Sequence, residues 1–241
     1  MIITSLENNK IKKYLKLKQK KYRDEEKLFL VEGEHLVEEA YKENLLFDLL
    51  VLEEFNYKIE FPYTFVTNSI MKKLSDMDSL PKVIGIVKMK EEREVFGNRI
   101  LLLDDVRDPG NLGTIIRSSV AFHITDIILS QGSVDLYNNK VIRSSQGMIY
   151  KVNIIRRDLK EIILKLKEEG YLILGTDVCD GDDVSTIVTN KYALVMGNEG
   201  QGVSSKIKEL CDKNIYIEMS DDCESLNVGV ATSIIIYELN R

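Results

Sequence analysis

Residues 100–119, ILLLDDVRDPGNLGTIIRSS, contain an apolar run, a turn and a segment of helical type, in that order. Pro109 and Gly110 favour the turn. Asn111 can cap the following helix, and Gly113 allows close approach of another backbone. The stretch therefore predicts a strand whose carboxyl end leads through a polar loop into a helix.

The same order recurs through the rest of the chain. Segments that are mostly of helical type separate further apolar runs, and together these runs are ILLLDD, DIILS, VNII, YLILG, YALVMG and NIYIEM. The alternation indicates an α/β fold with a largely parallel sheet that is covered on both faces. Ligands of such sheets bind beyond the carboxyl ends of the strands, so we expect the functional residues in the loops that follow these runs.

Residues 1–92 predict a separate, smaller α/β unit. An amphipathic segment from Ser5 to about Lys21 has the pattern of a capped helix, and a short strand, FLVEG, and a second helix, HLVEEAYKE, follow it. LFDLLVLEE and PKVIGIVKM have the composition of further strands. The charged segment KEEREVFGN, residues 90–98, has the composition of a linker to a second domain over residues 98–241.

The basic side chains are concentrated at one end of the chain. The net charge is −6, but residues 1–23 carry eight basic side chains against the single acid Glu7, a local charge of +7. Such a cluster can contact the phosphates of a nucleic acid, while the acidic remainder limits indiscriminate binding. A solvated, lysine-rich helix face is the alternative from composition alone.

Composition argues against two classes of protein. No apolar run approaches the ~20 residues of a membrane-spanning helix, and the first residues lack the order of a secretory signal, so we expect a cytoplasmic protein. Cys179, Cys211 and Cys223 are far apart and form no CxxC pair. This spacing argues against a disulfide framework and against a thiolate zinc site.

Arg117 is the first candidate for chemistry. It lies six residues after Asn111, near the start of the predicted helix, where a guanidinium opposes the helix macrodipole. The position therefore suggests a phosphate or a developing oxyanion as its partner. A salt bridge is the alternative, with Asp104, Asp105 or Asp108 as the possible partners.

A second loop, GNEGQG at residues 197–202, follows the run YALVMG. Its glycine order matches neither a dinucleotide-binding fingerprint nor a phosphate loop. Three glycines still expose backbone amides and carbonyls to a ligand, and Glu199 is a candidate for polar contacts. A flexible turn that Ser204 caps is the alternative.

A third loop, within IEMSDDCESLNVGVATSIII at residues 217–236, leads into an apolar C-terminal helix. It places Glu224, Ser225 and Asn227 at the entrance to that helix, and Ser225 can cap it. The acidic side chains suit a solvated loop better than a divalent-metal site, because they crowd one short stretch with no histidine nearby. The helix is apolar nearly all round, as are helices in a core or in a subunit interface.

In order and spacing, these three loops resemble the motifs of the SpoU/TrmH family of RNA 2′-O-ribose methyltransferases, a branch of the SPOUT superfamily. The resemblance covers residue 98 to the end, including the connecting segment GSVDLYNNKVIRSSQGMIY. The residues that match the motifs are Asn111, Gly113 and Arg117, then Met196, Gly197, Glu199 and Gly200, then Ile217, Met219 and residues 224–228.

The resemblance implies an enzyme that methylates a ribose 2′-hydroxyl of RNA with S-adenosylmethionine and needs no metal. It also implies a deep trefoil knot, in which the second and third loops thread through one another, and a homodimer that packs partly through the C-terminal helix. The cofactor-binding residues that it implies are Gly197, Ile217, Leu226, Met196, Gly200 and Met219.

The resemblance assigns removal of the hydroxyl proton to Arg117. A guanidinium is effectively always protonated, which favours a role in stabilising the developing alkoxide and orienting the adjacent phosphate. The sequence leaves both roles open. The residues implied to position Arg117, the ribose and the cofactor are Asn111, Glu199, Ser225 and Asn227.

The N-terminal stretch TSLENNKIKKYLKLKQKKYRDEEKLFLVEGEHLVEEA is similar to a small ribosomal-protein-like RNA-binding domain of the ribosomal-RNA branch. This similarity favours 23S rRNA as the substrate and makes the basic segment an RNA contact. Methylation of tRNA, a non-catalytic ribosome assembly factor and a metal-dependent phosphoryl-transfer enzyme are the alternatives.

Three residues depart from the family pattern. Glu218 stands where the family usually has proline, and Asp221 stands where it often has glycine; both substitutions fall in the cofactor loop. His123 replaces a glycine at an expected helix end, where a left-handed backbone conformation is needed.

Overall fold

The computed structural model describes residues 2–94, 96–178 and 180–241, so Cys179 lies outside the described residues. The chain divides into two compact units. Unit 1 comprises Met1–Glu91 and Asp135–Tyr150, and unit 2 comprises Glu92–Val134 and Lys151–Arg241. The sequence predicts residues 135–150 in the C-terminal domain, whereas in the structure they cluster with the N-terminal unit.

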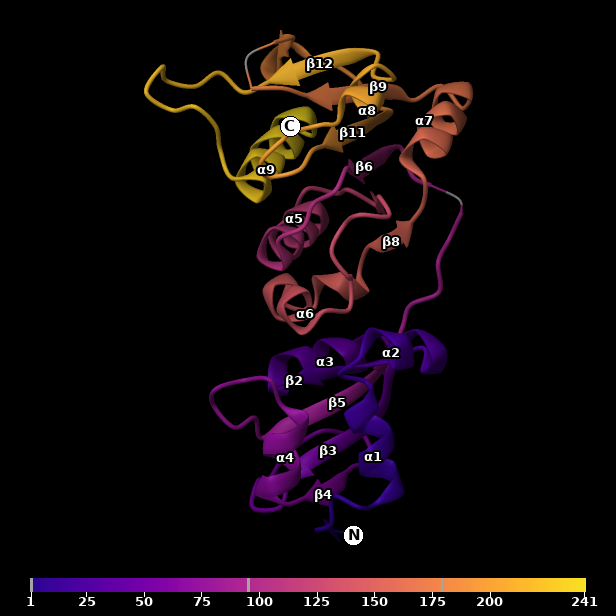
Figure 1. Ribbon diagram of the computed structural model, residues 1–241, viewed down its shortest axis with the longest axis vertical. Helices are drawn as coiled ribbons and strands as arrows, with labels where there is room; N and C mark the ends of the chain where they lie inside the picture. Colours follow the sequence, from indigo (N-terminus) through magenta and orange to yellow (C-terminus); the bar gives the residue numbers. More distant parts are fainter. Residues whose placement is uncertain (1, 95, 179) are drawn as a thin grey trace. The chain divides into compact units, whose positions relative to one another are not determined.

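Unit 1 is built on a five-stranded mixed sheet in the order β1-β4-β3-β5-β2 (Figure 1). Its elements are β1 (Ile2–Ile3), α1 (Asn9–Lys16), α2 (Lys20–Glu26), β2 (Leu28–Glu32), α3 (Glu34–Lys42), β3 (Leu46–Leu52), β4 (Thr64–Val66), α4 (Asn68–Leu74), β5 (Val83–Lys88), α6 (Asn139–Ser145) and a 3-10 turn (Met148–Tyr150). The predicted strands FLVEG, LFDLLVLEE and PKVIGIVKM correspond to β2, β3 and β5, and the helix HLVEEAYKE corresponds to α3.

The single helix expected from Ser5 to about Lys21 is wrong, because two helices, α1 and α2, occupy this part of the chain. The side chain of Asn8 caps α1 by accepting a 2.9 Å hydrogen bond from the Lys10 amide. Ser5 instead accepts from the Glu7 amide in the preceding turn. The capping signal therefore lies three residues later than the sequence pattern indicated.

Residues 135–150 belong to unit 1 through both an ion pair and aromatic packing. Asp135 pairs with Arg23, whose side chain is only 8% exposed. The ring centroid of Tyr137 lies 4.6 Å from that of Phe29 on β2, and the Tyr150 ring lies 6.4 Å from the same phenylalanine. A buried guanidinium needs a counter-charge, so residues 135–150 are an integral part of unit 1.

Ion pairs compensate most of the positive charge of residues 1–23. Lys10 pairs with Asp48 at 2.6 Å and Lys13 with Glu26 at 2.7 Å. The other ion pairs of this segment are Lys12–Glu7, Lys18–Asp76, Lys20–Asp24, Lys21–Glu25 and Arg23–Asp135. The exposed pairs are weak and leave the lysines able to exchange partners, whereas Arg23 is a structural residue.

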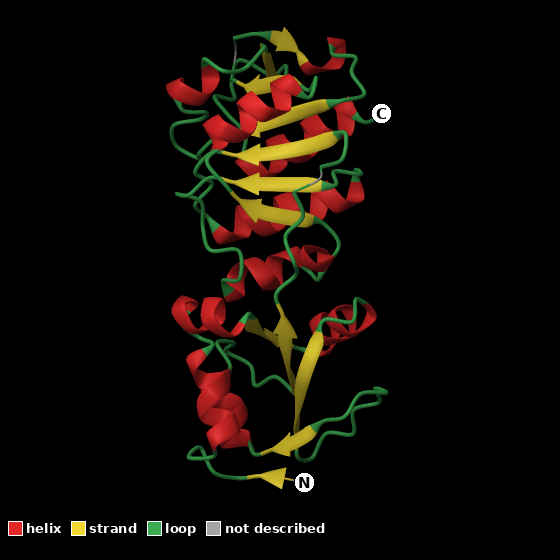
Figure 2. Ribbon diagram, turned by 90° about the vertical axis from the view of Figure 1, so that its right-hand side faces the viewer, coloured by secondary structure: helices red, strands yellow, loops and turns green. Residues whose placement is uncertain are grey.

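Unit 2 contains a seven-stranded sheet in the order β10-β12-β9-β11-β6-β7-β8, and all of its described pairings are parallel, as predicted (Figure 2). Its elements are β6 (Arg99–Leu103), α5 (Pro109–Ala121), β7 (Asp126–Leu129), β8 (Asn153–Arg156), α7 (Leu159–Glu168), β9 (Leu172–Thr176), β10 (Asp182–Asp183), a 3-10 turn (Val184–Thr186), β11 (Tyr192–Met196), α8 (Ser205–Lys208), β12 (Lys213–Tyr216) and α9 (Val228–Leu239).

Helices cover both faces of this sheet (Figure 2). Ile100 and Leu102 of β6 pack in one apolar cluster with Leu159 and Ile163 of α7. Because side chains alternate along a strand, the intervening residues of β6 face the opposite side, and α5 and α9 pack against each other there. Among the described residues, no helix is long and apolar enough to cross a membrane.

Replacing Asp135 by alanine should destabilise unit 1 by about 3 kcal/mol, because the substitution leaves the Arg23 guanidinium buried without a counter-charge. Urea unfolding followed by circular dichroism measures the change. The matched control is Asp24→Ala, which removes the exposed partner of Lys20 and should cost less than about 1 kcal/mol. Equal losses in the two variants would contradict the structural role of the Arg23–Asp135 pair.

Candidate active site

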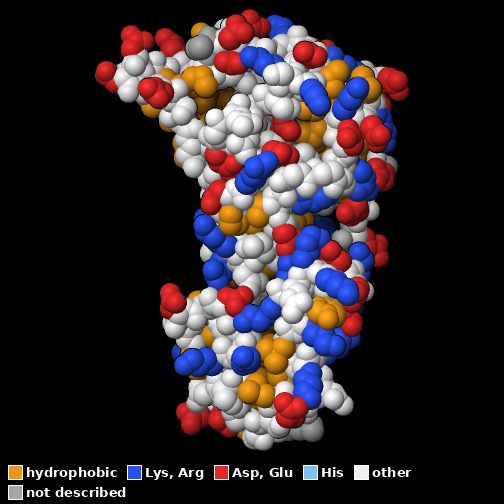
Figure 3. All heavy atoms as spheres, in the orientation of Figure 1, with side chains coloured by type: hydrophobic (Ala, Val, Ile, Leu, Met, Phe, Trp, Pro, Cys, Tyr) orange, Lys and Arg blue, Asp and Glu red, His pale blue; other side chains and the backbone are white. Residues whose placement is uncertain are grey.

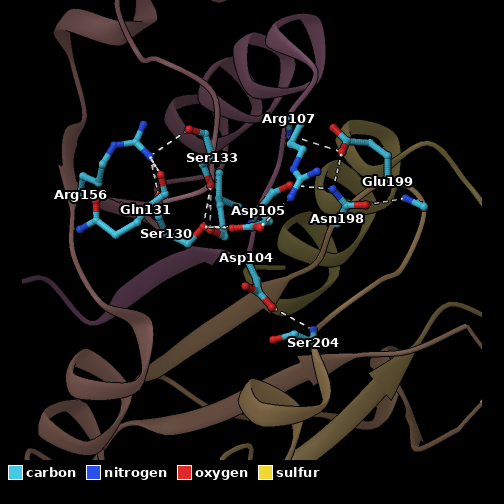
Figure 4. Close-up of polar contacts among 12 residues, drawn as sticks. Asp104, Asp105, Arg107, Ser130, Gln131, Ser133, Arg156, Asn198, Glu199 and Ser204 are labelled. Carbon is cyan, nitrogen blue, oxygen red and sulfur yellow. Dashed lines mark hydrogen bonds and ion pairs between the residues drawn. The ribbon is translucent and has the colours of Figure 1, made fainter.

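The loops after β6 and β11 meet at the side chain of Glu199 (Figure 4). Its Oε1 accepts hydrogen bonds from the Asp108 amide at 3.0 Å and from Asn111 Nδ2 at 3.1 Å. Its Oε2 accepts from the Arg107 amide at 3.3 Å. An ionised carboxylate has only acceptor atoms, and every partner here is a donor. The side chain therefore fixes the loop that precedes α5 against the glycine-rich loop.

The hydrogen bonds around Glu199 form a junction between two loops. Asn111 extends this junction to the third loop, which leads into α9. While its Nδ2 donates to Glu199, its Oδ1 accepts from Asn227 Nδ2 at 2.8 Å. The expectation that Asn111 caps its helix is wrong, because Asp108 is the N-cap of α5 and accepts from the Asn111 amide. Since the cap lies three residues earlier, the Asn111 side chain is left available for contacts between loops.

Asn227 holds the third loop at the start of α9. Its Oδ1 accepts from the amides of Gly229 and Val230, so Asn227 caps this helix and the expected cap Ser225 does not. A carboxamide presents an acceptor and two donor hydrogens, and one side chain therefore caps α9 while it also donates to Asn111. Three of the polar residues named from the sequence thus form one hydrogen-bonded chain, Glu199–Asn111–Asn227.

Glu199 stays ionised at this junction. Partial burial raises the pKa of its carboxyl, but the hydrogen bonds from Asn111 and from the amides of Asp108 and Arg107 outweigh this effect and hold the pKa below its ordinary value. The amides belong to the start of α5, where the helix dipole also favours negative charge. At neutral pH the site therefore contains a fixed carboxylate.

A cavity of about 770 Å³ adjoins this junction at the carboxyl ends of β9 and β11. A hollow with apolar side chains on its wall is visible in Figure 3 beneath the loop that precedes α9. The residues that the sequence analysis assigned to the cofactor all line it: Met196, Gly197, Gly200, Ile217, Met219 and Leu226. Glu199, Glu224, Ser225 and Asn227 also contribute to its lining. Its size is that of a small-molecule site.

Gly197 has a steric reason to be glycine. A Cβ atom at this position would lie 2.0 Å from the carbonyl carbon of Gly202 and 2.1 Å from the amide nitrogen of Val203. The glycine-rich loop folds back on itself here, with hydrogen bonds in both directions between Asn198 and Gly202. The loop is therefore a defined turn, and its backbone forms one wall of the cavity.

Arg117 lies on α5 with an exposed side chain, outside the lining of the cavity. Within the part of the chain that the structure describes, its guanidinium makes no ion pair. The salt-bridge alternative is wrong, because the three proposed acids have other roles. Asp104 accepts from the Ser204 amide, Asp105 pairs with Arg107, and Asp108 caps α5. The guanidinium is thus available to a ligand.

The third loop carries four exposed acidic side chains, at 218, 221, 222 and 224, so two of the departures from the family pattern point to solvent. Among the described residues, no group of histidine, cysteine, aspartate or glutamate side chains is placed to hold a metal ion. The departure at His123 behaves as predicted. Its φ of 62° is left-handed, directly after α5 and Phe122.

Asn198 was not named from the sequence, and Asp105 was named only as a possible salt-bridge partner of Arg117. Asp105 follows β6 with a left-handed φ of 58°, and Asn198 Nδ2 donates to its carbonyl oxygen at 2.8 Å. Asn198 also accepts from the Gly200 amide. The sequence signal for Asn198 was its place in a glycine-rich loop, since asparagine readily forms local turns. Its partner Asp105 could not be found from the local pattern, because it is 93 residues away in sequence.

Two family models match the chain. The SpoU rRNA Methylase family matches residues 98–237, and the MRM3-like substrate binding domain matches residues 8–85. A Bacillus subtilis (strain 168) protein, 23S rRNA (guanosine(2553)-2′-O)-methyltransferase RlmP, is 35% identical over 98% of this chain and 98% of its own length.

Solved structures of similar proteins share the fold of this chain. An AdoMet-bound rRNA methyltransferase from Sinorhizobium meliloti is 28% identical, with a TM-score of 0.87 over 99% of this chain and 96% of its own. A crystal structure of an RNA 2′-O ribose methyltransferase is 27% identical, with a TM-score of 0.85 over 99% of this chain and 97% of its own. Both alignments extend over the two units.

Glu199→Gln should weaken the junction, because the glutamine amide brings a donor towards the Asp108 and Arg107 amides. We expect a loss of about 1 kcal/mol at pH 7, limited by the exposure of the side chain. The lowered pKa means that the wild-type contribution is fully present above the ordinary glutamate pKa and is lost as the pH falls through the lower folded-state pKa.

Urea unfolding at pH 7 and at acidic pH, for the wild type and for Glu199→Gln, tests this expectation. The difference in unfolding free energy should shrink at acidic pH. Glu209→Gln, a change on the α8 C-cap residue of the same unit, serves as the control. A difference between wild type and Glu199→Gln that stays constant with pH would show that the carboxylate charge does not hold the loops.

Proposed function

Because the chain belongs to the SpoU rRNA methylase family, we propose that it transfers a methyl group from S-adenosylmethionine to the 2′-hydroxyl of a ribose in RNA. The observation that carries the proposal is the hydrogen-bonded chain Glu199–Asn111–Asn227, which joins all three motif loops beside one cavity. Such a junction sets the distance between a bound cofactor and the side chains of α5. Positioning of this kind is the main requirement of a displacement reaction.

The cavity suits S-adenosylmethionine in size and lining. When bound, this cofactor supplies a methyl group on a positively charged sulfonium. The apolar side chains of Ile217, Met219 and Leu226 form a surface for an aromatic base, and the close-packed turn at Gly197 offers backbone groups for hydrogen bonds. The ionised Glu199 places a negative charge on the cavity wall, which complements a cation.

Arg117 acts on the ribose. A guanidinium remains protonated in a protein, so it donates hydrogen bonds to the 2′-oxygen as negative charge develops there and to the neighbouring phosphate. The proton leaves through that phosphate or through water. The lack of an ion pair for Arg117 in the described structure supports this role, because all donors of its guanidinium are then open to the ribose and the phosphate.

The proposed substrate is 23S rRNA. Its support is the pairing of the methylase domain with a substrate-binding domain in unit 1, and similarity along the whole chain to a relative whose name specifies 23S rRNA. The experiment is incubation of the protein with tritiated S-adenosylmethionine and with separate transcripts of 23S rRNA and of tRNA. We expect label in 23S rRNA, at a 2′-oxygen. Label in tRNA alone would contradict 23S rRNA as the substrate. Binding of the cofactor without any methyl transfer would contradict the proposed methyltransferase activity.

Arg117→Lys should keep the charge but lose the planar fork of donors, and it should abolish most of the methyl transfer while the affinity for S-adenosylmethionine changes little. Methyl transfer to 23S rRNA and calorimetric titration of the cofactor measure the two quantities. Arg241→Lys, at an exposed residue beyond α9, is the control. Near-normal turnover by Arg117→Lys would remove Arg117 from the mechanism.

We also propose a trefoil knot around the second and third loops, and a homodimer. The knot is supported by residues 197–203 of the second loop and Ile217, Met219 and residues 224–228 of the third loop, which line the same cavity although β12 lies between the two loops in sequence. The dimer is supported by α9, which leaves Val230 46% exposed and Tyr237 49% exposed within one chain. These residues are seven apart and share one helix face, which a second copy can cover.

Val230→Glu should convert the dimer to a monomer, because it places a charge in the centre of the proposed apolar contact. Sedimentation analysis should give twice 27.6 kDa for the wild type and 27.6 kDa for the variant. The matched control is Val188→Glu, on a loop residue that is 96% exposed, and it should leave the mass of the assembly unchanged. A monomeric wild type, or a dimeric Val230→Glu variant, would contradict this interface.

A further inference from the structure

We propose that Arg107 binds the RNA phosphate beside the methylated ribose, as a second arginine of the active site. Its backbone amide donates to Glu199, so the residue belongs to the junction itself. Its side chain is 69% exposed, and Nη2 lies 3.2 Å from Asp105 Oδ2 (Figure 4). The remaining donors of the guanidinium stay open to solvent. The inference rests on the proposed function, because it names a contact with the RNA of that same site.

Several contacts fix the position of Asp105, which orients Arg107. Ser130 donates to Asp105 Oδ1 at 2.7 Å and accepts from the Asp105 amide at 2.9 Å. A Cβ on Gly132 would lie 2.3 Å from Asp105 Oδ1, so only glycine allows this approach. The Ser130 hydroxyl, followed by Arg107, lowers the pKa of Asp105 against the effect of its burial.

The loop that contacts Asp105 is fixed in turn by Arg156 at the end of β8 (Figure 4). Its guanidinium donates to the carbonyl oxygens of Ser133 at 2.9 Å and Val134 at 2.7 Å. Asp105 therefore has a rigid position that does not depend on its bond with Arg107. An exposed ion pair adds little to stability, so stability does not explain the arrangement. Its effect is to pre-orient a guanidinium, which lowers the entropic cost of binding a ligand.

The charge of unit 2 requires cations at the site. Unit 2 contains 15 basic and 22 acidic side chains, a net charge of −7. The loop before α5 itself carries Asp104, Asp105 and Asp108, and Glu199 is ionised beside it. An RNA backbone that approaches these carboxylates is repelled unless fixed cations face its phosphates. Arg107 is a cation of this loop, and a guanidinium matches the paired oxygens of a phosphate.

The test compares Arg107→Ala and Arg107→Lys with the wild type in binding of a 23S rRNA transcript at several salt concentrations. Arg107→Ala should raise the dissociation constant about tenfold and make the slope of log K against log salt shallower by about 0.8, the effect of losing one phosphate contact. Arg107→Lys should keep the slope and lose a smaller part of the affinity. The control Arg241→Ala removes an arginine that is 71% exposed and also lies near an acid, and it should change neither quantity.

Calorimetric titration of S-adenosylmethionine is the second measurement, and it should give wild-type affinity in all three variants. Arg107→Ala could bind RNA with the same affinity and the same salt slope as the wild type. If the wild-type protein also methylates RNA, that result would overturn the role of Arg107 and leave the proposed function intact. An equal loss of cofactor and RNA binding would show a structural role and overturn the inference. Absence of methyl transfer by the wild-type protein would instead count against the proposed function.

Discussion

The Glu199 carboxylate accepts hydrogen bonds from two backbone amides and from Asn111, and these bonds join loops that are about ninety residues apart in sequence. The parallel sheet makes the meeting possible, because β6 and β11 are neighbours and their carboxyl ends open at the same edge. A carboxylate suits the position, since each partner is a donor and the start of α5 favours negative charge. This contact joins the loop that begins α5 to the loop that lines the cavity.

The sequence predicted the classes of element and the loops of the site, because hydrophobic periodicity and glycine position are local properties. It misplaced three helix caps. Ser5, Asn111 and Ser225 have the chemistry of caps, but Asn8, Asp108 and Asn227 are the capping residues. A local sequence pattern shows which residues can cap a helix, but it does not show which of their side chains bind other partners in the fold. Asn111 was such a case, because its side chain is used by partners 88 and 116 residues away.

Long-range ion pairs also change the interpretation of the basic N-terminal segment. Counting residues gave +7 over the first 23 positions, but Asp48, Asp76 and Asp135 lie far along the chain and come to this surface only in the fold. Unit 1 as a whole contains 18 basic and 17 acidic side chains, a net charge of +1. The segment is therefore a surface of exchangeable lysines rather than a strong positive field.

The two units thus differ in how they can treat an anionic substrate. Unit 2, with a net charge of −7, repels RNA, and under the proposed roles of Arg107 and Arg117 it attracts RNA only near these two arginines. Screening confines both the repulsion and the attraction to about 8–10 Å at ordinary salt, the scale of one or two nucleotides. Affinity for a longer stretch of RNA has to come from unit 1, whose exposed ion pairs exchange carboxylates for phosphates at small cost. On the proposed function, RNA that unit 1 does not also hold would be bound only weakly by the acidic unit.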